Sequence, residues 1–516
     1  MQRPRVTFSY EDADVGFPPP FDEEKVLETL NVGQRKAVGL MLEGKNVFLT
    51  GYAGTGKTYT LNAFISIAEA RGKKVAVTAT TGIAATHLGG RTWHSWSGIG
   101  IPRDNLAATL DKLVGNNPKP WHAMAAYSIA KTDILIVDEI SMMDAKSFRM
   151  LDGVCRGVRQ IVNRDKPFGN LQVILVGDMG QLEPVRKGNE PPAYCFLAQE
   201  FWDAKLEFCQ LEQIMRQEDE SFSKALRLIR RGKIDLNAPV ERDMFDIIRA
   251  RVNAFDPSAK PEATHLCTHN AQADSINAAK LRKVPGDESL FVASDNATNE
   301  YEIKRLDEDC LEPKELRIKV GARIMMTKNE PPDYANGTLG YVVKIDSRHE
   351  RGDGTIRVKL DNDVEIDVAR ATREVRAGYS RSGEKTLERV QFPMRLAWAI
   401  TVHKSQGITL DRASVNIQKA FCQGQAYVAL SRVRSLEGLN IEGGFSPANV
   451  FVGEEVRDFF KLTKLLSDGD RVNAARIFSA SRYFGRRRLK MDGCGLTLSD
   501  LQERSELDFK TIYDDR

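Results

Sequence analysis

Apolar runs and helical spacing alternate along this chain, and their order predicts a mostly parallel α/β fold. Short apolar runs that predict buried strands lie at Asn46–Thr50, Val75–Thr80, Asp133–Glu139, Leu171–Val176, Thr264–His269 and Arg395–Val402. Helical spacing follows several of them, at Lys57–Ala70, Met142–Gln160, Phe222–Arg231, Asn270–Lys283 and Gln425–Val433. Strands that alternate with helices form parallel sheets, which bind ligands at the carboxyl ends of the strands.

The α/β pattern occurs twice, and a different pattern interrupts its second occurrence. Period-two strands between about 311 and 390, as in Ile356/Val358/Leu360, predict a small inserted β-barrel. We therefore expect a flexible N-terminus (1–20), a first α/β domain (21–210), a second (211–310 and 391–450) and a polar tail (451–516). The first domain carries a small insertion at about 100–131. The tail contains a basic run, 486–490, for which a solvated charge cluster and a nucleic-acid contact both stay open.

Composition narrows the class of protein. Lys plus Arg number 74 and Asp plus Glu 71, so any basic surface has to be local. The seven cysteines include no C-x-x-C pair, which is typical of free thiols in a reducing compartment. No apolar run is long enough to span a membrane, and the N-terminus lacks the apolar core of a secretion signal. We expect a cytoplasmic protein, associated with the nucleoid in a bacterium or phage.

Gly51–Thr58 reads Gly-Tyr-Ala-Gly-Thr-Gly-Lys-Thr and fits the phosphate-loop pattern G-x-x-x-x-G-K-[ST] at every fixed position. A predicted strand precedes it and a predicted helix follows it, which is the context that phosphate binding requires. The residues expected to bind the nucleotide, ATP, are Gly51, Ala53, Gly54, Thr55, Gly56, Lys57 and Thr58. Lys57 would neutralise the β- and γ-phosphates, and Thr58 would ligate Mg²⁺.

Other polar residues complete a candidate site for ATP hydrolysis. Asp138 and Glu139 end a predicted strand, where one carboxylate can hold Mg²⁺ and the other can orient the attacking water. Gln181 follows another strand and can sense the γ-phosphate. Gln34 opens a helix before the loop, where its amide can read the adenine edge. The second α/β unit has no phosphate loop, so Arg216 and Arg432 are its candidates for reaching the nucleotide.

Two segments have the composition of nucleic-acid contacts. Arg91–Trp96 interleaves two tryptophans with Arg, His and Ser, which suits base stacking for one indole while the other belongs to the core. His403, Lys404 and Ser405 follow an apolar strand and can contact a phosphate backbone.

Six segments together resemble the Pif-type family of superfamily-one DNA helicases, which is related to the Dda and RecD-like helicases. They are Gly51–Thr58, Thr80–Ala85 with Arg91–Gly100, Asp138–Gln160, Gly177–Val185, Leu396–Asp411 and Gln425–Leu439. Asp138–Leu151, Ala397–Gly407 and Tyr427–Arg432 are especially specific. The matches run from about Gln34 to about Leu439, which is most of the chain.

The resemblance implies two RecA-like, phosphate-loop-type domains with parallel sheets, a wedge inserted in the first and a Src-homology-three-like barrel in the second. It implies ATP-driven movement 5′ to 3′ on single-stranded DNA and unwinding of duplex DNA, in replication, repair, recombination or telomere maintenance. It also implies a monomer that acts on single-stranded and forked DNA alongside replication or repair proteins. The residues it assigns are Gln34 and Gly407 at the nucleotide, Arg216 and Arg432 as arginine fingers, and Thr80, Gly82, His94, Trp96, His403, Lys404 and Ser405 at DNA.

One departure and one alternative accompany this resemblance. Met179-Gly180 stands where family members often have an aromatic residue, and Glu183 stands where proline is usual, so no DNA-stacking role passes to Met179. The alternative function is an ATP-driven translocase that remodels nucleoprotein and unwinds duplex weakly. A binding protein with an inert nucleotide site is disfavoured, because Lys57, Glu139 and Arg432 are all intact.

Overall fold

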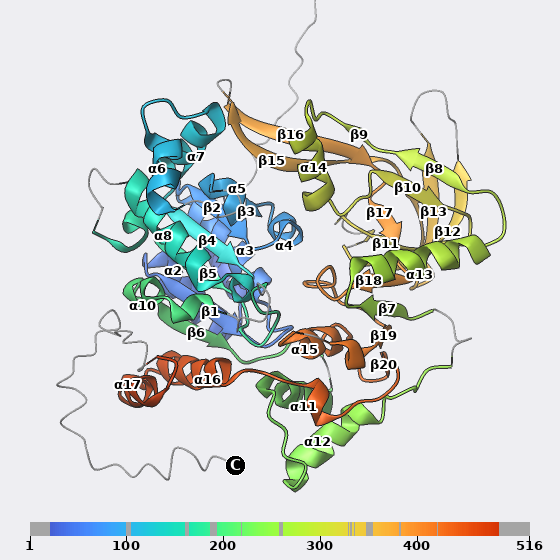
Figure 1. The fold of residues 1–516 in the computed structure, drawn as a ribbon. Helices are drawn as coiled ribbons and strands as arrows, with labels where there is room; N and C mark the ends of the chain where they lie inside the picture. Colours follow the sequence, from blue (N-terminus) through green and yellow to red (C-terminus); the bar gives the residue numbers. More distant parts are fainter. Residues whose placement is uncertain are drawn as a thin grey trace, which may run out of the picture.

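A six-stranded parallel sheet forms the centre of the first lobe (Figure 1). Its order is β3-β2-β4-β5-β1-β6, with strands β1 (Val47–Gly51), β2 (Val75–Ala79), β3 (Arg91–Thr92), β4 (Ile134–Asp138), β5 (Gln172–Val176) and β6 (Glu207–Leu211). The computed structural model describes residues 21–99, 105–159, 165–185, 193–217, 219–256, 262–328, 330, 333–334, 336–346, 354–380, 383–420 and 422–484. Strand β1 is buried throughout and β5 is buried from Val173 to Val176, as expected for a sheet covered by helices.

Helices cover both faces of this sheet. One apolar cluster joins it to α2 (Val32–Leu42) and α3 (Lys57–Ala70), while another joins it to α8 (Ala145–Val158) and α10 (Gln199–Asp203). The predicted bounds of α3 are confirmed. The remaining helical segments of the lobe are α1 (Glu23–Glu28), α4 (Gly82–His87), α5 (Trp93–Ser97), η1 (Ile140–Met142), η2 (Pro167–Asn170) and η3 (Cys195–Leu197).

The small insertion contains two helices, α6 (Leu106–Val114) and α7 (Pro120–Lys131), and its predicted first residues, 100–104, lie outside the described part. A Cβ on Gly153 of α8 would lie 2.7 Å from Leu106, and one on Gly157 would lie 2.3 Å from Leu110. Glycines on α8 therefore let α6 approach its backbone closely, which docks the insertion on the first lobe.

The second lobe is built on a four-stranded parallel sheet of order β18-β7-β19-β20. Its strands are β7 (Thr264–Cys267), β18 (Ala399–Thr401), β19 (Ala413–Val415) and β20 (Leu439–Ile441), and its helical segments are α11 (Glu220–Arg231), α12 (Pro239–Arg249), α13 (Asn270–Lys283), α15 (Gln425–Leu430), η4 (Ile417–Lys419) and η5 (Pro447–Asn449). The predicted bounds of α13 are confirmed. Both parallel sheets thus support the α/β prediction.

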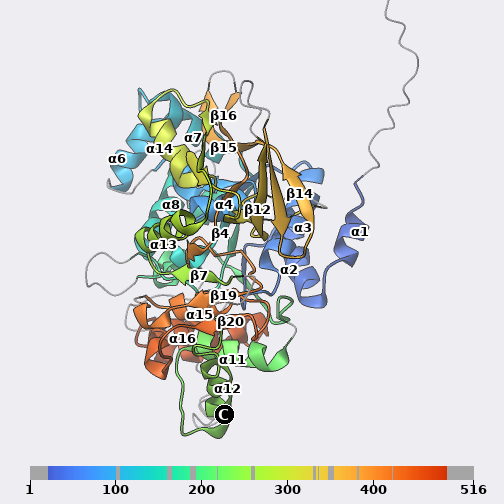
Figure 2. The ribbon, with the colours of Figure 1, turned by 90° about the vertical axis from the view of Figure 1, so that its right-hand side faces the viewer.

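An inserted antiparallel region separates β7 from β18. Its five-stranded sheet has the order β14-β13-β12-β11-β17, and two smaller sheets pair β10 with β8 and β15-β16-β9. The elements are β8 (Ser289–Val292), β9 (Ser294–Asp295), α14 (Glu300–Asp309), β10 (Glu315–Ile318), β11 (Arg323–Met326), β12 (Leu339–Asp346), β13 (Thr355–Leu360), β14 (Glu365–Val368), β15 (Ala371–Ser380), β16 (Gly383–Gln391) and β17 (Met394–Leu396). Figures 1 and 2 both place the β15–β16 hairpin next to α7.

Two sequence predictions change at the ends of this region. The inserted sheets recruit residues from Ser289 onward, earlier than the predicted start near 311, because β8 and β9 pair with β10 and β16. The single strand predicted over Arg395–Val402 is wrong. Met394–Leu396 pairs with β11 of the insertion, while Ala399–Thr401 pairs with β7 of the second lobe. An unbroken apolar run cannot show that its two halves join different sheets.

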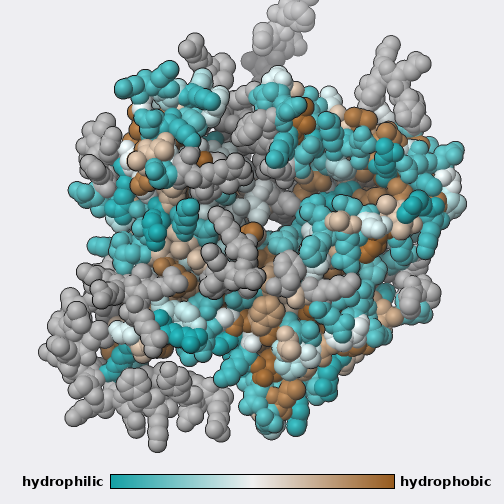
Figure 3. Space-filling view, viewed as in Figure 1, coloured by the Kyte–Doolittle hydropathy of each residue, from teal (hydrophilic) through white to brown (hydrophobic). Residues whose placement is uncertain are grey.

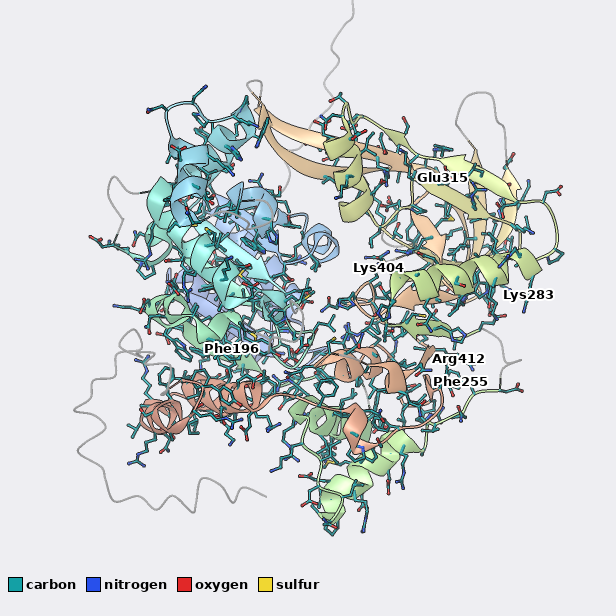
Figure 4. All side chains as sticks on the ribbon, viewed as in Figure 1. Phe196, Phe255, Lys283, Glu315, Lys404 and Arg412 are labelled. Carbon is teal, nitrogen blue, oxygen red and sulfur yellow. The ribbon has the colours of Figure 1, made fainter. Side chains whose placement is uncertain are left out.

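The segment after Val450 is not a polar tail over its described length. It forms α16 (Glu454–Ser467) and α17 (Arg471–Ala480), which pack against the first lobe. Phe459 of α16 stacks on Phe196, labelled in Figure 4, with 4.2 Å between ring centroids. Val456, Phe459 and Leu462 recur at helical spacing and form the buried face of α16, a pattern that the sequence analysis overlooked. The basic run 486–490 lies outside the described residues.

Polar side chains dominate the outer surface of the described molecule. Hydrophilic residues cover most of the face seen in Figure 3, with apolar patches scattered among them. Among the described residues, helices that combine the length and apolarity needed to cross a bilayer are absent.

Candidate functional site

The phosphate loop lies between β1 and the start of α3, as its motif predicts. Gly54 and Gly56 adopt φ values of 82° and 80°, a left-handed conformation that favours glycine. Lys57 Nζ donates hydrogen bonds to the carbonyls of Gly51 (3.0 Å) and Tyr52 (3.1 Å), which holds the ammonium inside the loop. Helix α3 begins at Lys57 without a side-chain cap, so its first N–H groups are available to an anion.

Two of the loop glycines also make room for residues that the sequence singled out. A Cβ on Gly54 would lie 2.6 Å from the Cβ of Arg216, and a Cβ on Gly56 would lie 2.6 Å from Gln34 Nε2. The loop therefore contacts one candidate from its own lobe and one from the segment that leads into the second lobe.

Gln34 is fixed by its own helix and by the loop. Its Oε1 accepts the Asn31 N–H (3.1 Å), and its Nε2 donates to the Thr55 carbonyl (3.3 Å). A glutamine amide offers two N–H donors and two acceptor lone pairs, so one of each remains. One remaining donor and one remaining acceptor match the hydrogen-bonding groups on the edge of adenine.

The two acids end β4 close to Lys57. The Asp138 carboxylate accepts the Glu139 N–H at 2.8 Å, and Glu139 has a φ of 51°, rare for a residue with a side chain. Burial, and then the neighbouring Glu139 charge, raise the pKa of Asp138, while burial raises that of Glu139. Burial lowers the pKa of Lys57, against the opposing charges of Asp178, Glu139 and Asp138.

The oxygen atoms at this end of β4 suit a divalent cation. The two buried carboxylates would be stabilised by a cation between them, and the exposed Thr58 at the start of α3 supplies a hydroxyl oxygen. Asp138 and Thr58 therefore fit a Mg²⁺ ion.

The second lobe contributes two arginines. Arg432 is 2% exposed and donates to the Val428 carbonyl (2.8 Å) and the Ser431 hydroxyl (2.9 Å). Burial lowers its pKa, and the Glu139 carboxylate is the main opposing charge. Arg216 Nη1 donates to the Ser431 carbonyl (3.0 Å), and burial, followed by the Arg432 charge, lowers the pKa of Arg216 to about 9. Arg216 therefore lies against the phosphate loop, and Arg432 lies close enough to Glu139 for their charges to interact.

Direct contacts between the lobes join this site. The Tyr427 hydroxyl of α15 accepts the Ala53 N–H at 2.8 Å. A Cβ on Gly424 would lie 2.0 Å from the Gln181 carbonyl, so the start of α15 abuts the turn after β5. Gln181 itself is 5% exposed. Sequence reasoning placed Tyr427 in a matching segment but gave it no role, since nothing local shows which backbone group its hydroxyl meets.

A buried ion pair that was not predicted from the sequence lies close to this site. Arg230 of α11 and Asp178, which follows β5, form an ion pair at 2.8 Å with side-chain exposures of 9% and 0%. Asp178 lies in a segment that the sequence marked, whereas Arg230 is one of several basic residues on an ordinary amphipathic helix. Its burial was the missing information.

The predicted DNA residues of the first lobe differ in accessibility. Thr80 Oγ1 donates to the Glu139 carbonyl (2.9 Å), so it joins the segment after β2 to the backbone that follows β4. The stacking role predicted for Trp96 is wrong for this structure, because both Trp93 and Trp96 are buried in the core at 2% and 1% exposure. Burial lowers the pKa of His94 to about 4, and its ring lies 3.7 Å from that of Trp93. His94 is therefore neutral at pH 7.

The predicted DNA-binding residues of the second lobe also differ in accessibility. Ser405 is fully buried and its hydroxyl donates to the Val402 carbonyl (2.7 Å), so the predicted direct DNA contact of Ser405 is not available. His403 and Lys404 are half-buried, and Lys404 lies near one end of α13 (Figure 4). Burial and Arg395 lower the pKa of Lys404. Gly407 is exposed with a φ of 76°, and Gly82 begins α4.

A family model and several known proteins match this chain. Residues 29–238 match the model of the PIF1-like helicase. The chain is 35% identical to the ATP-dependent DNA helicase PIF1 of Mus musculus, over 84% of this chain and 62% of the relative. It is 36% identical to the ATP-dependent DNA helicase Pif1 of Psychrobacter sp. (strain PRwf-1), over 80% of this chain and 67% of the relative. The chain thus spans a little under two thirds of the length of the mouse relative.

Solved structures of a third relative share the fold. Bacteroides sp Pif1 in complex with ADP-AlF4 is 30% identical, with a TM-score of 0.70, over 86% of this chain and 98% of that one. Bacteroides Pif1 bound to ssDNA is 30% identical, with a TM-score of 0.57, over 85% and 98%. Sequence and fold agree over both lobes, and the chain belongs to the PIF1-like helicase family.

Proposed function

We propose that this protein is an ATP-dependent DNA helicase that moves 5′ to 3′ on single-stranded DNA and unwinds duplex DNA. The main observation behind the proposal is that both lobes contact the phosphate loop. Tyr427 accepts the Ala53 N–H, and Arg216 lies against Gly54, so groups from both lobes meet at one site. A site of this kind converts nucleotide cleavage into relative movement of the lobes.

Each proposed site residue has a distinct task. Lys57 and the N-terminus of α3 bind the phosphates. Asp138 and Thr58 would hold Mg²⁺, whose charge would offset that of the phosphates. Glu139 orients the attacking water. Arg432 and Arg216 stabilise the charge that develops on the transferred phosphoryl group, and Gln181 senses its presence.

The DNA path runs over residues that remain accessible. Thr80, Gly82, His94, His403 and Lys404 are the proposed contacts, with His94 acting as a neutral hydrogen-bonding group. The bond from Thr80 to the Glu139 carbonyl supplies a direct route from DNA to the catalytic acid. The two lobes are proposed to be RecA-like, and the five-stranded antiparallel sheet to be the Src-homology-three-like barrel. Forked DNA is the proposed substrate for unwinding.

ATP turnover measured with and without single-stranded DNA tests the proposal. We expect DNA to stimulate turnover, and Lys57→Ala to abolish it, because the phosphates lose their buried cation. Lys73→Ala, which alters an exposed lysine beyond the end of α3, is the matched control. A duplex with a 5′ tail should be unwound, and one with a 3′ tail should not. Equal turnover with and without DNA would contradict the proposal, and strand release from the 3′ tail alone would reverse the polarity.

A further inference from the structure

The Arg230–Asp178 pair lies beside the nucleotide site but has no part in the tasks just described. Arg230 Nε donates to both Asp178 carboxylate oxygens, at 2.8 and 3.0 Å, and Nη2 lies 2.8 Å from one of them. Removing two charges from water is costly, and a buried pair is tolerated only when its geometry is good. This pair meets that condition with a forked contact.

Arg230 also connects the phosphate loop to α16. Its guanidinium carbon lies 4.8 Å from the ring centroid of Tyr52, which is the second residue of the loop. On the other side it lies 3.9 Å from the ring centroid of Phe460 on α16. An arginine over an aromatic face is attracted by the ring electrons, most strongly where water is excluded. Tyr52, Arg230 and Phe460 therefore form a continuous contact from α16 to the loop.

The unusual Gly180 belongs to the same arrangement. A Cβ at this position would lie 2.7 Å from Arg230 Cγ and 3.1 Å from Phe460 Cζ. The small residue at this point thus leaves space for the arginine and the phenylalanine ring. An aromatic side chain here would displace both.

The turn held by this pair carries Gln181. Asp178 Oδ1 accepts the Gly180 N–H (2.9 Å), and the Asp178 carbonyl accepts the Gln181 N–H (2.8 Å). The orientation of the Asp178 side chain therefore sets the path of the backbone that leads to Gln181. Arg230 fixes that orientation, and Phe460 fixes Arg230.

We propose that Arg230 is a positioning residue for ATP hydrolysis, and that Phe460 of α16 holds it in place, so that the C-terminal segment tunes the turnover rate. The inference rests on the proposed role of Gln181. It acts on kcat more than on the KM for ATP, because the charged bonds of Arg230 go to the turn of Gln181, while its contact with Tyr52 involves only the ring.

Phe460→Leu is a sharper test than a change at Arg230, whose removal would leave Asp178 buried and unpaired. Leucine keeps an apolar side chain but removes the ring face. The matched control is Phe478→Leu on α17, which alters a buried ring that packs on Trp202 (4.8 Å) in the same C-terminal segment.

We expect Phe460→Leu to lower the DNA-stimulated kcat about fivefold, with the KM for ATP changed less than twofold, and Phe478→Leu to leave both unchanged. Equal kcat values for Phe460→Leu and the wild type would overturn the inference, as would equal losses in the two leucine variants. Gln181→Ala distinguishes a failure of the proposed Gln181 role from a failure of the positioning role. If Gln181→Ala retains full turnover, the proposed role of Gln181 fails. If it loses turnover while Phe460→Leu does not, only the positioning role fails.

Discussion

The two lobes supply charge to the proposed nucleotide site in opposite ways. In the first lobe, the Lys57 cation lies among three carboxylates, Asp138, Glu139 and Asp178, which follow neighbouring strands β4 and β5. In the second lobe, Arg216 and Arg432 donate to oxygens of their own lobe's backbone and the Ser431 hydroxyl. Among the described residues, neither arginine has a carboxylate within ion-pair distance.

This difference has a direct consequence for coupling. The charges of the first lobe largely compensate one another, and Arg230 of α11 is a further partner for Asp178. The second lobe brings two desolvated cations whose natural counter-charge is an anion held by the first lobe, either Glu139 or a triphosphate. Closing of the lobes should therefore respond to the charge state of the nucleotide.

The strongest test of this contrast is Arg432→Ala. We expect the kcat for ATP to fall at least ~10³-fold, since an arginine that stabilises the transferred phosphoryl group contributes about 10³ to 10⁵ in rate. Nucleotide affinity, measured by titration with ADP, should change less than threefold. Arg434→Ala is the control, because that arginine is 58% exposed and pairs with Asp411 on the surface. An equal loss of affinity and turnover would make Arg432 part of the binding site instead.

A second test concerns Arg216, which is nearer the loop but less buried. Arg216→Ala should lower kcat about 100-fold, the effect of removing one donor from a developing negative charge. Met215→Ala, at an adjacent side chain that is 60% exposed, should have no effect. If Arg216→Ala raises the KM for ATP while kcat is unchanged, the arginine contributes to ground-state binding alone.

The same contrast explains what the sequence could predict. The first lobe's half of the site follows from local patterns, because strand, loop and helix are contiguous and α3 has the predicted bounds. The partners of Arg216 and Tyr427 come from residues some 160 to 370 positions away, and no periodicity encodes such contacts. Trp96 has the composition of a stacking segment, yet its burial depends on how α5 packs against the core.

The contact between Tyr427 and Ala53 should have a smaller effect. Tyr427→Phe removes the hydroxyl and leaves a buried N–H unsatisfied, at a cost of about 1–3 kcal/mol. We expect kcat/KM for ATP to fall about fivefold or more, because the contact between the lobes is weakened. Tyr341→Phe removes a hydroxyl that accepts the Glu262 N–H (3.2 Å) away from the site, so it should leave kcat/KM unchanged. Similar losses in both variants would assign the effect to general stability.

The smallest expected effect concerns the pH dependence of stability, which a polar residue of the first lobe should control. Burial holds the pKa of His94 near 4, below its usual value of 6.5, with the Asp144 charge opposing. As the pH falls below 6.5, the unfolded chain therefore binds this proton before the folded one does. Stability present above pH 6.5 is lost as the pH approaches 4, by about 1–2 kcal/mol between pH 7.5 and pH 5. His94→Phe keeps a ring against Trp93 but cannot titrate. Between pH 7.5 and pH 5, the free energy of unfolding of His94→Phe, measured with denaturant, should therefore fall by about 1–2 kcal/mol less than that of the wild type. Identical pH dependence in the two proteins would show that folding leaves the pKa of His94 unshifted, which would contradict the effect of its burial.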